Sequence, residues 1–434
     1  MIKPKSSDRP LQAGQYRPVV GRRLKPLLAV VFVLFGLLSI NSAYLISITI
    51  AEWLTDDVFQ EYFYQLMFLG HLLLGLVLVL PAVVFGALHL RNAWPRPNYR
   101  AIRVGLALYT TVLLLLISGI VLTRFDFFSV KDPTVRGLAY WTHVVTPLLV
   151  IGLFLLHRLA GLSIRYRAGI VWGAVAIVVV AITLVPQVLE KRSDAADRSA
   201  QASVADIERS FFPALSQIQD GENLSADLLM MDQYCQDCHA DVHEKWQHSA
   251  HRFSSFNNPA YRFSVMQTRQ MSLSRDGNTH ASRFCAGCHD PVPLFAGVYD
   301  DPDFGAMDDP LASAGITCTA CHAITGIESP RGNADYTIAA PEHYPFTFSN
   351  NGFLQWVNRQ LVKAKPAFHK KTFLKPLHME PEFCGSCHKV HLPPALNNYK
   401  WLRGQNHQDS YHLSGVSGPG ASSFYYPPKA IHKC

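Results

Sequence analysis

The sequence predicts an all-α membrane bundle of five transmembrane helices, followed by a mostly helical and irregular second domain. Three observations predict this fold class. Long apolar runs dominate residues 1–190, the chain then becomes polar and rich in turn-forming residues, and fifteen of the nineteen histidines lie beyond residue 190. With 434 residues the chain is long enough for two or three domains. We expect an N-terminal tail over 1–26, the bundle over 27–190, a polar linker over 191–232 and the second domain over 233–434.

The second domain contains the pentapeptide Cys-x-x-Cys-His four times. Two cysteines at this spacing can each form a thioether with a haem vinyl group, and the adjoining histidine then becomes the proximal iron ligand. Zinc ribbons, thiol redox motifs and disulfides also use paired cysteines, but none of them needs a histidine directly after the second cysteine. The sequence therefore predicts a multihaem c-type cytochrome with four covalent haems, bound by Cys235, Cys238 and His239; Cys285, Cys288 and His289; Cys318, Cys321 and His322; and Cys384, Cys387 and His388.

The haems are expected to hold this domain together. Gly, Pro, Asn and Asp interrupt it often, and no long apolar–polar alternation or heptad is present. The motifs start 50, 33 and 66 residues apart, which is too irregular for a solenoid repeat. We expect short helical turns that carry the motifs and pack around porphyrin rings.

Five segments of the first 190 residues are long and apolar enough to cross a bilayer, which takes about 20 residues of helix. The first is too long for a secretory signal peptide, has no small-residue cleavage site and is followed by four more apolar segments. The predicted spans are 27–50, 64–89, 103–123, 139–157 and 169–189.

Charge placement predicts the orientation of these spans. Residues 1–190 hold 17 Lys and Arg against 8 Asp and Glu, whereas residues 191–434 hold 22 against 24. The basic residues gather before the first span and after the second and fourth, and the loop after the first span holds only acidic ones. Because Lys and Arg mark the cytoplasmic side, we expect a bacterial inner-membrane protein with a cytoplasmic N-terminus and a periplasmic second domain, where c-type haem is attached. No basic-aromatic stripe predicts a nucleic-acid partner.

Only four histidines lie in the membrane half: His71 and His89 in the second predicted span, and His143 and His157 in the fourth. Spacings of 18 and 14 residues bring each pair to one face of its helix, about 27 and 21 Å apart along the axis. Ionisable groups within spans are costly and usually functional. Because the second and fourth spans run parallel, we expect His71 opposite His143 and His89 opposite His157. Two bis-histidine b haems fit this arrangement, and a packing or helix-end role is the alternative for any single histidine.

Two glycines of the third span, Gly105 and Gly119, are also 14 residues apart. A missing side chain at each level would admit a porphyrin edge, or would simply serve helix packing. Over residues 60–160 this pattern resembles the di-haem four-helix core of the cytochrome b type. It is similar also to membrane b subunits that link periplasmic redox enzymes to quinone. The resemblance implies a quinone or quinol substrate.

Each c haem needs a second axial ligand or keeps an open position. The many histidines outside the motifs favour bis-histidine haems of low potential. The run from Trp246 through Ser249 to His251 resembles the W-x-x-S-x-H segment after a haem motif in cytochrome c554-like and related multihaem families. The context Gly315-Ile-Thr before Cys318 is similar to those families too. The resemblance implies that His251 ligates the haem of another motif. Weaker candidates, each with a surface position as the alternative, are His280, His343, His391 and His407.

The ninth cysteine, Cys434, is the last residue of the sequence. The preceding Tyr-Tyr-Pro-Pro-Lys-Ala-Ile-His-Lys, residues 425–433, resembles the approach to a further haem motif in the same families. We expect Cys434 to open a fifth Cys-x-x-Cys-His motif and so to bind a fifth c haem. A free terminal thiol is the alternative.

Together these features predict a membrane-anchored electron-transfer cytochrome. It would connect the quinone pool, through two b haems, to a periplasmic or outer-membrane redox protein, through four or five c haems. Quinol oxidation is the favoured direction, because bis-histidine c haems have low potentials. The competing hypothesis is a terminal oxidoreductase that acts on a small nitrogen or sulfur compound at a haem with an open position. A haem-delivery protein would not need so many fixed haems. An oligomer is possible on this sequence.

Overall fold

The computed structural model describes residues 19–55, 59–160, 166–201, 211–219, 223–306, 308–392, 402–418 and 430–431. Its contacts divide the chain into two compact units. The helical unit comprises the described residues up to Ser199 together with His343–Lys365. The motif unit comprises Ala200–Glu342 and the described residues from Pro366 onward.

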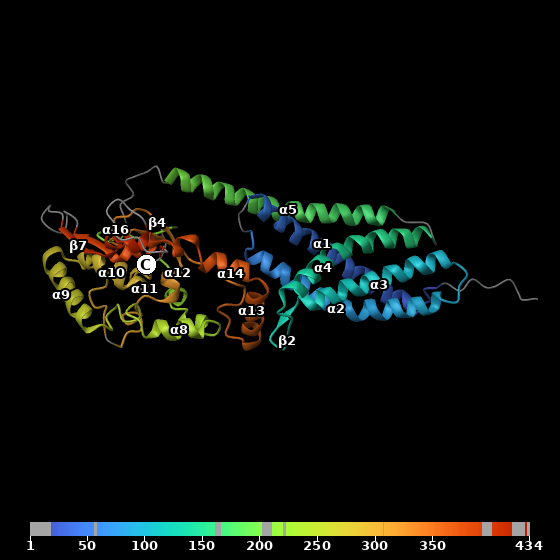
Figure 1. Ribbon diagram of the computed structural model, residues 1–434, viewed down its shortest axis with the longest axis horizontal. Coiled ribbons are helices and arrows are strands. Elements are labelled where there is room, and N and C mark those ends of the chain that lie inside the picture. Colours follow the sequence, from blue (N-terminus) through green and yellow to red (C-terminus); the bar gives the residue numbers. More distant parts are fainter. Residues whose placement is uncertain are drawn as a thin grey trace, which may run out of the picture. The chain divides into compact units, whose positions relative to one another are not determined.

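Five helices form the helical unit, and all five are long and apolar enough to cross a membrane. They confirm the predicted membrane bundle and differ from the predicted spans by only a few residues at most ends. In Figure 1 they are coloured from blue to green: α1 (Leu24–Thr55), α2 (Tyr62–Ala93), α3 (Tyr99–Leu122), α4 (Pro133–Leu159) and α5 (Tyr166–Gln201), of which Gly169–Gln187 is the apolar part.

Capping residues set where two of these helices begin. The side chain of Asn98 accepts a hydrogen bond from the backbone N–H of Ala101 at the start of α3. At the start of α4, Asp132 accepts from the N–H groups of Thr134 and Val135, with Pro133 in the first turn. Side-chain acceptors at this position satisfy backbone donors that have no partner within the helix, and proline is tolerated there because its missing N–H is not needed.

A segment from much later in the sequence completes the helical unit. Helix α13 (Gly352–Ala364) contacts the hairpin of β1 (Arg124–Phe125) and β2 (Phe128–Ser129), which connects α3 to α4 (Figure 1). From the sequence, residues 343–365 were expected in the second domain. Their contacts are instead with the membrane helices and the loops between them.

Stacking and charge hold this segment in place. The ring of Trp356 stacks on Phe125 with centroids 6.2 Å apart, and Lys363 forms a salt bridge with Asp126. Gln360 Nε2 donates to the same carboxylate over 2.7 Å. The partners lie more than 230 residues apart in sequence, so no local pattern could have predicted the contact.

The motif unit consists of short helices joined by irregular segments, which confirms the mostly helical and irregular character predicted for it. Its α-helices are α6 (Ala226–Leu229), α7 (Asp232–Gln236), α8 (Ala240–Gln247), α9 (Pro259–Asp276), α10 (Arg283–His289), α11 (Pro291–Phe295), α12 (Cys318–His322), α14 (Pro366–Phe373), α15 (Pro381–His388) and α16 (His407–Leu413). Single turns of 3-10 helix are η1 (His280–Ser282), η2 (Pro376–Met379) and η4 (Gly415–Ser417).

Two small sheets tie these helices together. In the first, β3 (Gln217–Ile218) pairs in parallel with β5 (Tyr336–Ile338), which pairs antiparallel with β4 (Ile324–Ile327). In the second, β6 (Lys389–Leu392) pairs antiparallel with β7 (Leu402–Asn406). Each sheet connects the end of a motif helix to a segment from elsewhere in the unit, because β4 follows α12 and β6 follows α15.

The core of the motif unit begins earlier in the chain than its composition predicts. The polar linker was expected over 191–232, but α5 continues to Gln201 and the apolar side chains of Phe211, Ala214, Leu224 and Leu229 are buried in the core. Because polar residues surround them in the sequence, the overall composition of the segment does not reveal these few apolar residues. They pack with larger groups such as Phe295 and Tyr336.

Candidate functional site

Two pairs of histidine rings face each other within the helical unit. His71 on α2 and His143 on α4 have ring centroids 6.1 Å apart, and His89 and His157 on the same helices have centroids 6.0 Å apart. Two imidazoles on opposite sides of one iron, with metal–nitrogen bonds about 2 Å long, have centroids about 6 Å apart. The structure thus brings together the same two pairs that the sequence spacing predicts, at a separation that suits a shared iron.

Neighbouring helices hold the rings of three of these histidines through Nδ1. His71 Nδ1 lies 3.1 Å from Asn41 Oδ1 on α1. His143 Nδ1 lies 3.3 Å from the carbonyl oxygen of Leu115, and His157 Nδ1 lies 3.1 Å from a carbonyl oxygen of α3. A histidine that donates through Nδ1 keeps Nε2 as the metal-binding atom, and this contact fixes the orientation of the ring.

His89 is held differently. Its ring stacks on Phe85, with centroids 5.3 Å apart and planes 14° apart. Its Nδ1 is buried, and the structure gives it no hydrogen-bond partner among the residues described. Of the two histidine pairs, the one that contains His89 is therefore the less firmly oriented.

The two glycines of α3 have a more specific place than the sequence predicts. A Cβ atom at Gly105 would lie 2.9 Å from Cε1 of His157, and one at Gly119 would lie 3.0 Å from Cε1 of His143. Such contacts are closer than side-chain carbons tolerate. Each glycine makes room for the imidazole on α4. That a porphyrin edge also lies against α3 here stays a prediction.

In the motif unit, every Cys-x-x-Cys-His segment lies on or at the end of a short helix. The four helices are α7, α10, α12 and α15, and the last three end at the motif histidine. Thiols of different motifs meet: Cys235 hydrogen-bonds with Cys318, and Cys288 with Cys387. The first motif is thus next to the third, and the second next to the fourth.

Three motif histidines also have a contact at Nδ1. His289 Nδ1 lies 2.8 Å from the carbonyl oxygen of Ser254, and His322 Nδ1 is hydrogen-bonded to the carbonyl oxygen of Phe373. His388 Nδ1 lies 3.3 Å from the side-chain amide of Gln405. For His289 and His322, which face carbonyl oxygens as in the helical unit, the contact leaves Nε2 for a metal. His388 Nδ1 instead accepts from the amide nitrogen of Gln405.

The first and third motifs each have a second histidine ring nearby. His239 faces His369 of α14, with centroids 6.1 Å apart and planes 12° apart. His322 lies 4.9 Å from His378 of η2, centroid to centroid. His378 Nδ1 accepts a hydrogen bond from a backbone N–H, and its buried Nε2 has no partner among the described residues. Burial lowers the pKa of His378 to about 4, so the ring is neutral, as a metal ligand must be.

Sequence reasoning did not select His369 or His378. Both lie between residue 365 and the fourth motif, in segments with no local pattern that points to a ligand. The only signal in the sequence was the surplus of histidines. Their role depends on where α14 and η2 pack, which tertiary contacts decide.

The fourth motif has two histidines within reach. The ring of His388 lies 6.2 Å from that of His251 and 6.0 Å from that of His407, centroid to centroid. Both candidates came from the sequence, and the structure places both at this one motif. His251 does cross to a motif other than the one it follows, as the family resemblance implies.

The residues around His251 explain how the crossing is built. Trp246 Nε1 donates to the carbonyl oxygen of Ile316 over 2.8 Å, and Ile316 N donates to the carbonyl oxygen of His251 over 2.9 Å. These bonds fix the backbone of His251 against the segment that immediately precedes the third motif. Gly315, with φ of 69°, allows the approach, since a Cβ there would lie 2.4 Å from the carbonyl oxygen of Arg252.

Other predicted ligands lie elsewhere. His280 is exposed at the start of η1, and His391 lies on β6, where its backbone bonds to the side chain of Asn333. His343 belongs to the helical unit, where its ring contacts Phe348 at 4.9 Å. Its Nε2 is buried, and burial lowers its pKa to about 4. Cys434 lies outside the described residues.

The second motif is surrounded by different groups. Tyr261 stacks on His289 with centroids 4.4 Å apart, and its hydroxyl hydrogen-bonds to the carboxylate of Asp290, as does Ser255. Burial raises the pKa of Asp290 to about 7 despite these hydrogen bonds, which oppose the shift. No ring contact joins His289 to another histidine in the part of the chain that the structure describes.

One of these regions matches a known protein family. Residues 234–323, which include the first three motifs, match the family model described as Cytochrome c554 and c-prime. This segment is a c-type cytochrome domain. The c-type cytochrome domain implies covalent c-type haem and electron transfer. Searches of curated proteins and of solved structures found no match.

The side chains of the c-type cytochrome domain fit its cofactor. Each of its three motifs supplies two thiols and an imidazole from five consecutive residues on or beside a short helix. A covalent porphyrin would use all of these groups. In the helical unit, the donor set is two imidazoles per level, which suits a non-covalent haem.

Proposed function

We propose that the protein is a membrane electron-transfer cytochrome. It passes electrons between a lipid-soluble quinone, through two b haems held by the helical unit, and a redox protein in the periplasm, through four c haems held by the motif unit. When bound, haem iron supplies one-electron transfer, and the chain supplies ligands, spacing and exclusion of water. In this proposal the protein lies in a bacterial inner membrane with its motif unit outside.

The observation that carries the proposal is the double pairing of histidines on α2 and α4. Two facing pairs at 6.1 and 6.0 Å on one pair of membrane helices are difficult to explain by packing. Polar groups in spans are costly, and each pair would be destabilising without a ligand between its rings. His71 with His143 would hold one b haem, and His89 with His157 the other.

The ring pairs of the motif unit support the outer part of the same path. His239 with His369, and His388 with either His251 or His407, have the separation that a shared iron requires. Neighbouring motifs share thiol contacts, so their haems would be close enough to exchange electrons. Closely spaced haems with paired histidine ligands favour electron transfer over chemistry on a substrate.

A pyridine haemochrome spectrum of the purified protein tests this proposal. It separates non-covalent b haem from covalent c haem, and we expect two b haems to four c haems, or to five if Cys434 begins a further motif. Anaerobic mixing with menaquinol-4 should reduce both types. A preparation with c haem and no b haem would refute the membrane part of the proposal.

A second candidate function rests on the second motif. His289 is stacked by Tyr261, and no histidine ring contacts it among the described residues. A haem there could keep one position open and act on a small nitrogen or sulfur compound. A high-spin electron paramagnetic resonance signal, and nitric oxide binding without loss of an endogenous ligand, would favour this function. Low-spin signals from every haem would exclude this second function, and electron transfer would remain as the proposed function.

A further inference from the structure

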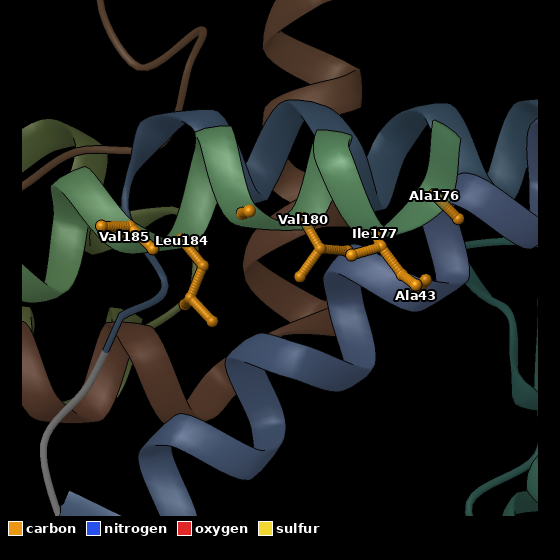
Figure 2. Close-up of a pocket in the computed structure, with 7 residues that line it drawn as sticks. Ala43, Ala176, Ile177, Val180, Leu184 and Val185 are labelled. Atoms are coloured by element: carbon orange, nitrogen blue, oxygen red, sulfur yellow. The ribbon is translucent and has the colours of Figure 1, made fainter. Parts of the chain in front are cut away.

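An apolar groove of about 380 Å³ lies between α1 and α5 in the helical unit. Figure 2 shows side chains of α5 directed toward α1 along it. Its lining contains no polar side chain: Ala43 from α1, and Ala176, Ile177, Val180, Ala181, Leu184 and Val185 from α5. A groove of this kind in a membrane helix pair suits a long hydrocarbon chain.

The groove ends at a polar group on each helix. Gln187 is three residues after Leu184 and seven after Val180, so it lies on the same face of α5. Its Nε2 lies 3.4 Å from the hydroxyl of Tyr44, the neighbour of Ala43 on α1. Tyr44 is fully buried, and Val180 and Leu184 pack against the cluster to which it belongs.

Three carboxamide oxygens in this part of the unit have unsatisfied hydrogen-bonding capacity. Oε1 of Gln187, Gln65 and Gln60 is buried, and none has a partner among the described residues. Gln65 is itself fully buried, and its Nε2 reaches the backbone oxygen of Gln60 at 3.4 Å. Gln60 in turn donates to Glu52, which also accepts from a backbone N–H. All three unmet groups are acceptors, so a ligand must bring hydrogen-bond donors.

The end of the groove is close to a candidate haem ligand. Asn41 and Ser42 immediately precede Ala43, and both contact Nδ1 of His71, at 3.1 and 3.5 Å. Asn41 is also tied to α2 through the backbone of Met67. A molecule in the groove with its head near Tyr44 would therefore lie beside the side chains that hold the ring of His71.

We propose that this groove binds the reduced form of a lipid-soluble quinone. The isoprenoid tail lies between α1 and α5, and the ring hydroxyls donate to carboxamide oxygens at the end of the groove, Gln187 first. A quinol carries two O–H donors, whereas the oxidised quinone carries only acceptors and would leave these oxygens unsatisfied. The inference rests on the proposed function and adds to it a location, near His71, and a preference for binding the reduced form.

Equilibrium binding of tritiated menaquinol-4 to the full-length holoprotein in phosphatidylcholine nanodiscs tests the site. The protein is kept reduced with dithionite so that the quinol is not consumed. Gln187→Leu removes the acceptor with little change of size and should weaken menaquinol-4 binding about tenfold, the effect of one hydrogen bond. Thr183→Val, which removes a hydroxyl from α5 outside the groove, should leave the affinity unchanged.

A second pair of variants tests the tail. Ala181→Leu fills the groove and should weaken menaquinol-4 by at least about tenfold, because three added carbons exclude a similar volume of ligand. The same loss is expected for menaquinone-4, measured with the oxidised protein in the absence of dithionite. Menadiol, which lacks the tail, should be unaffected. Ala174→Leu makes the same change on α5 one heptad away, outside the lining, and should have no effect.

The possible outcomes distinguish a failure of the proposed quinol site from a failure of the proposed function. Unchanged menaquinol-4 affinity in both Gln187→Leu and Ala181→Leu would overturn the site, as would displacement of the probe by an equal concentration of phosphatidylethanolamine, which would indicate a phospholipid groove. If menaquinol-4 still reduced the b haems in those variants at the wild-type rate, only the location would be wrong. If it failed to reduce them in the wild-type protein, the proposed function itself would fail.

Discussion

The helical unit and the motif unit present histidine rings at similar separations but position them by different means. In the helical unit both rings of a pair come from two long helices, and each helix serves both levels. In the motif unit one ring is fixed by its Cys-x-x-Cys-His helix, and the other comes from a short element such as α14 or α16. Regular helices therefore make the first arrangement predictable from spacing, while packing decides the second.

The two units also differ in what keeps a haem in place. A b haem in the helical unit would depend on its two axial ligands and the surrounding packing, whereas a c haem is bound to the chain by two thioethers. Loss of a ligand should consequently remove the cofactor in one unit and only change its coordination in the other.

The largest effect is expected for a ligand of the helical unit. His71→Leu should remove one b haem, so that the pyridine haemochrome gives one b haem to four c haems, and reduction by menaquinol-4 should stop. His280→Leu, which changes an exposed histidine of the motif unit, is the matched control and should keep all haems. Two b haems in purified His71→Leu would show that the ligand pairing is wrong.

In the motif unit, His369→Ala should keep the full c haem content, because the thioethers to Cys235 and Cys238 remain. The first haem should change from low-spin to high-spin, which electron paramagnetic resonance at low temperature measures. The same substitution at His391, whose backbone on β6 bonds to the side chain of Asn333, provides the comparison. A low-spin spectrum in His369→Ala would assign the sixth ligand elsewhere.

Gly105→Ala tests how tightly α3 fits the histidines of α4. The new Cβ would lie 2.9 Å from His157, so we expect partial loss of the second b haem and a fall in the unfolding free energy of about 1–3 kcal/mol. Gly152→Ala on α4 is the control, since a Cβ there meets nothing within 4 Å. In both variants, thermal unfolding measures the stability and the pyridine haemochrome measures the b haem content. Equal behaviour of the two variants would exclude the steric role.

Gly315→Ala addresses the backbone approach at His251. Gly315 and Gly277 both have φ near 70°, but a Cβ at Gly277 meets nothing within 4 Å, whereas one at Gly315 would clash with a carbonyl oxygen at 2.4 Å. Both variants carry the strain of a left-handed residue. Gly315→Ala should additionally lower the unfolding free energy by about 1–3 kcal/mol, as denaturant titration of the c haem absorbance would show.

The smallest effect is expected for Asp126→Asn. The hydrogen bond from Lys363 holds the pKa of the Asp126 carboxyl below its usual value, but both side chains are more than two-fifths exposed. Solvent screening limits the contribution to less than about 1 kcal/mol. Because the pKa in the folded state is lowered, the contribution is present above the unfolded value near 4 and is lost as pH falls below it. The difference in melting temperature between wild type and variant should thus be seen at pH 7 and shrink as pH falls below the unfolded pKa toward the lower folded pKa.

Much of the helical unit could be predicted because its physics is local. Apolar runs give the spans, and a repeat of 3.6 residues per turn places His71 with His89, and His143 with His157, on single faces. The thioether motifs are equally local. The positions of His369 and His378 beside motif histidines could not be predicted, since neither lies in a pattern and both depend on the packing of short segments. The packing of residues 343–365 with the membrane helices was not predicted either, because it also depends on tertiary contacts.

The packing of residues 343–365 on the helical unit has a consequence for how proteolysis can divide the polypeptide. The backbone passes between the units after Ser199, before His343 and again after Lys365. A protease that cuts only near Ser199 would not free the motif unit, because Trp356, Lys363 and Lys365 would still hold residues 343–365 to the loops and to Tyr64 of α2. A version of the motif unit without the helical unit would need residues 343–365 excised or replaced. During synthesis, the first four helices are made before this late segment can pack against their loops.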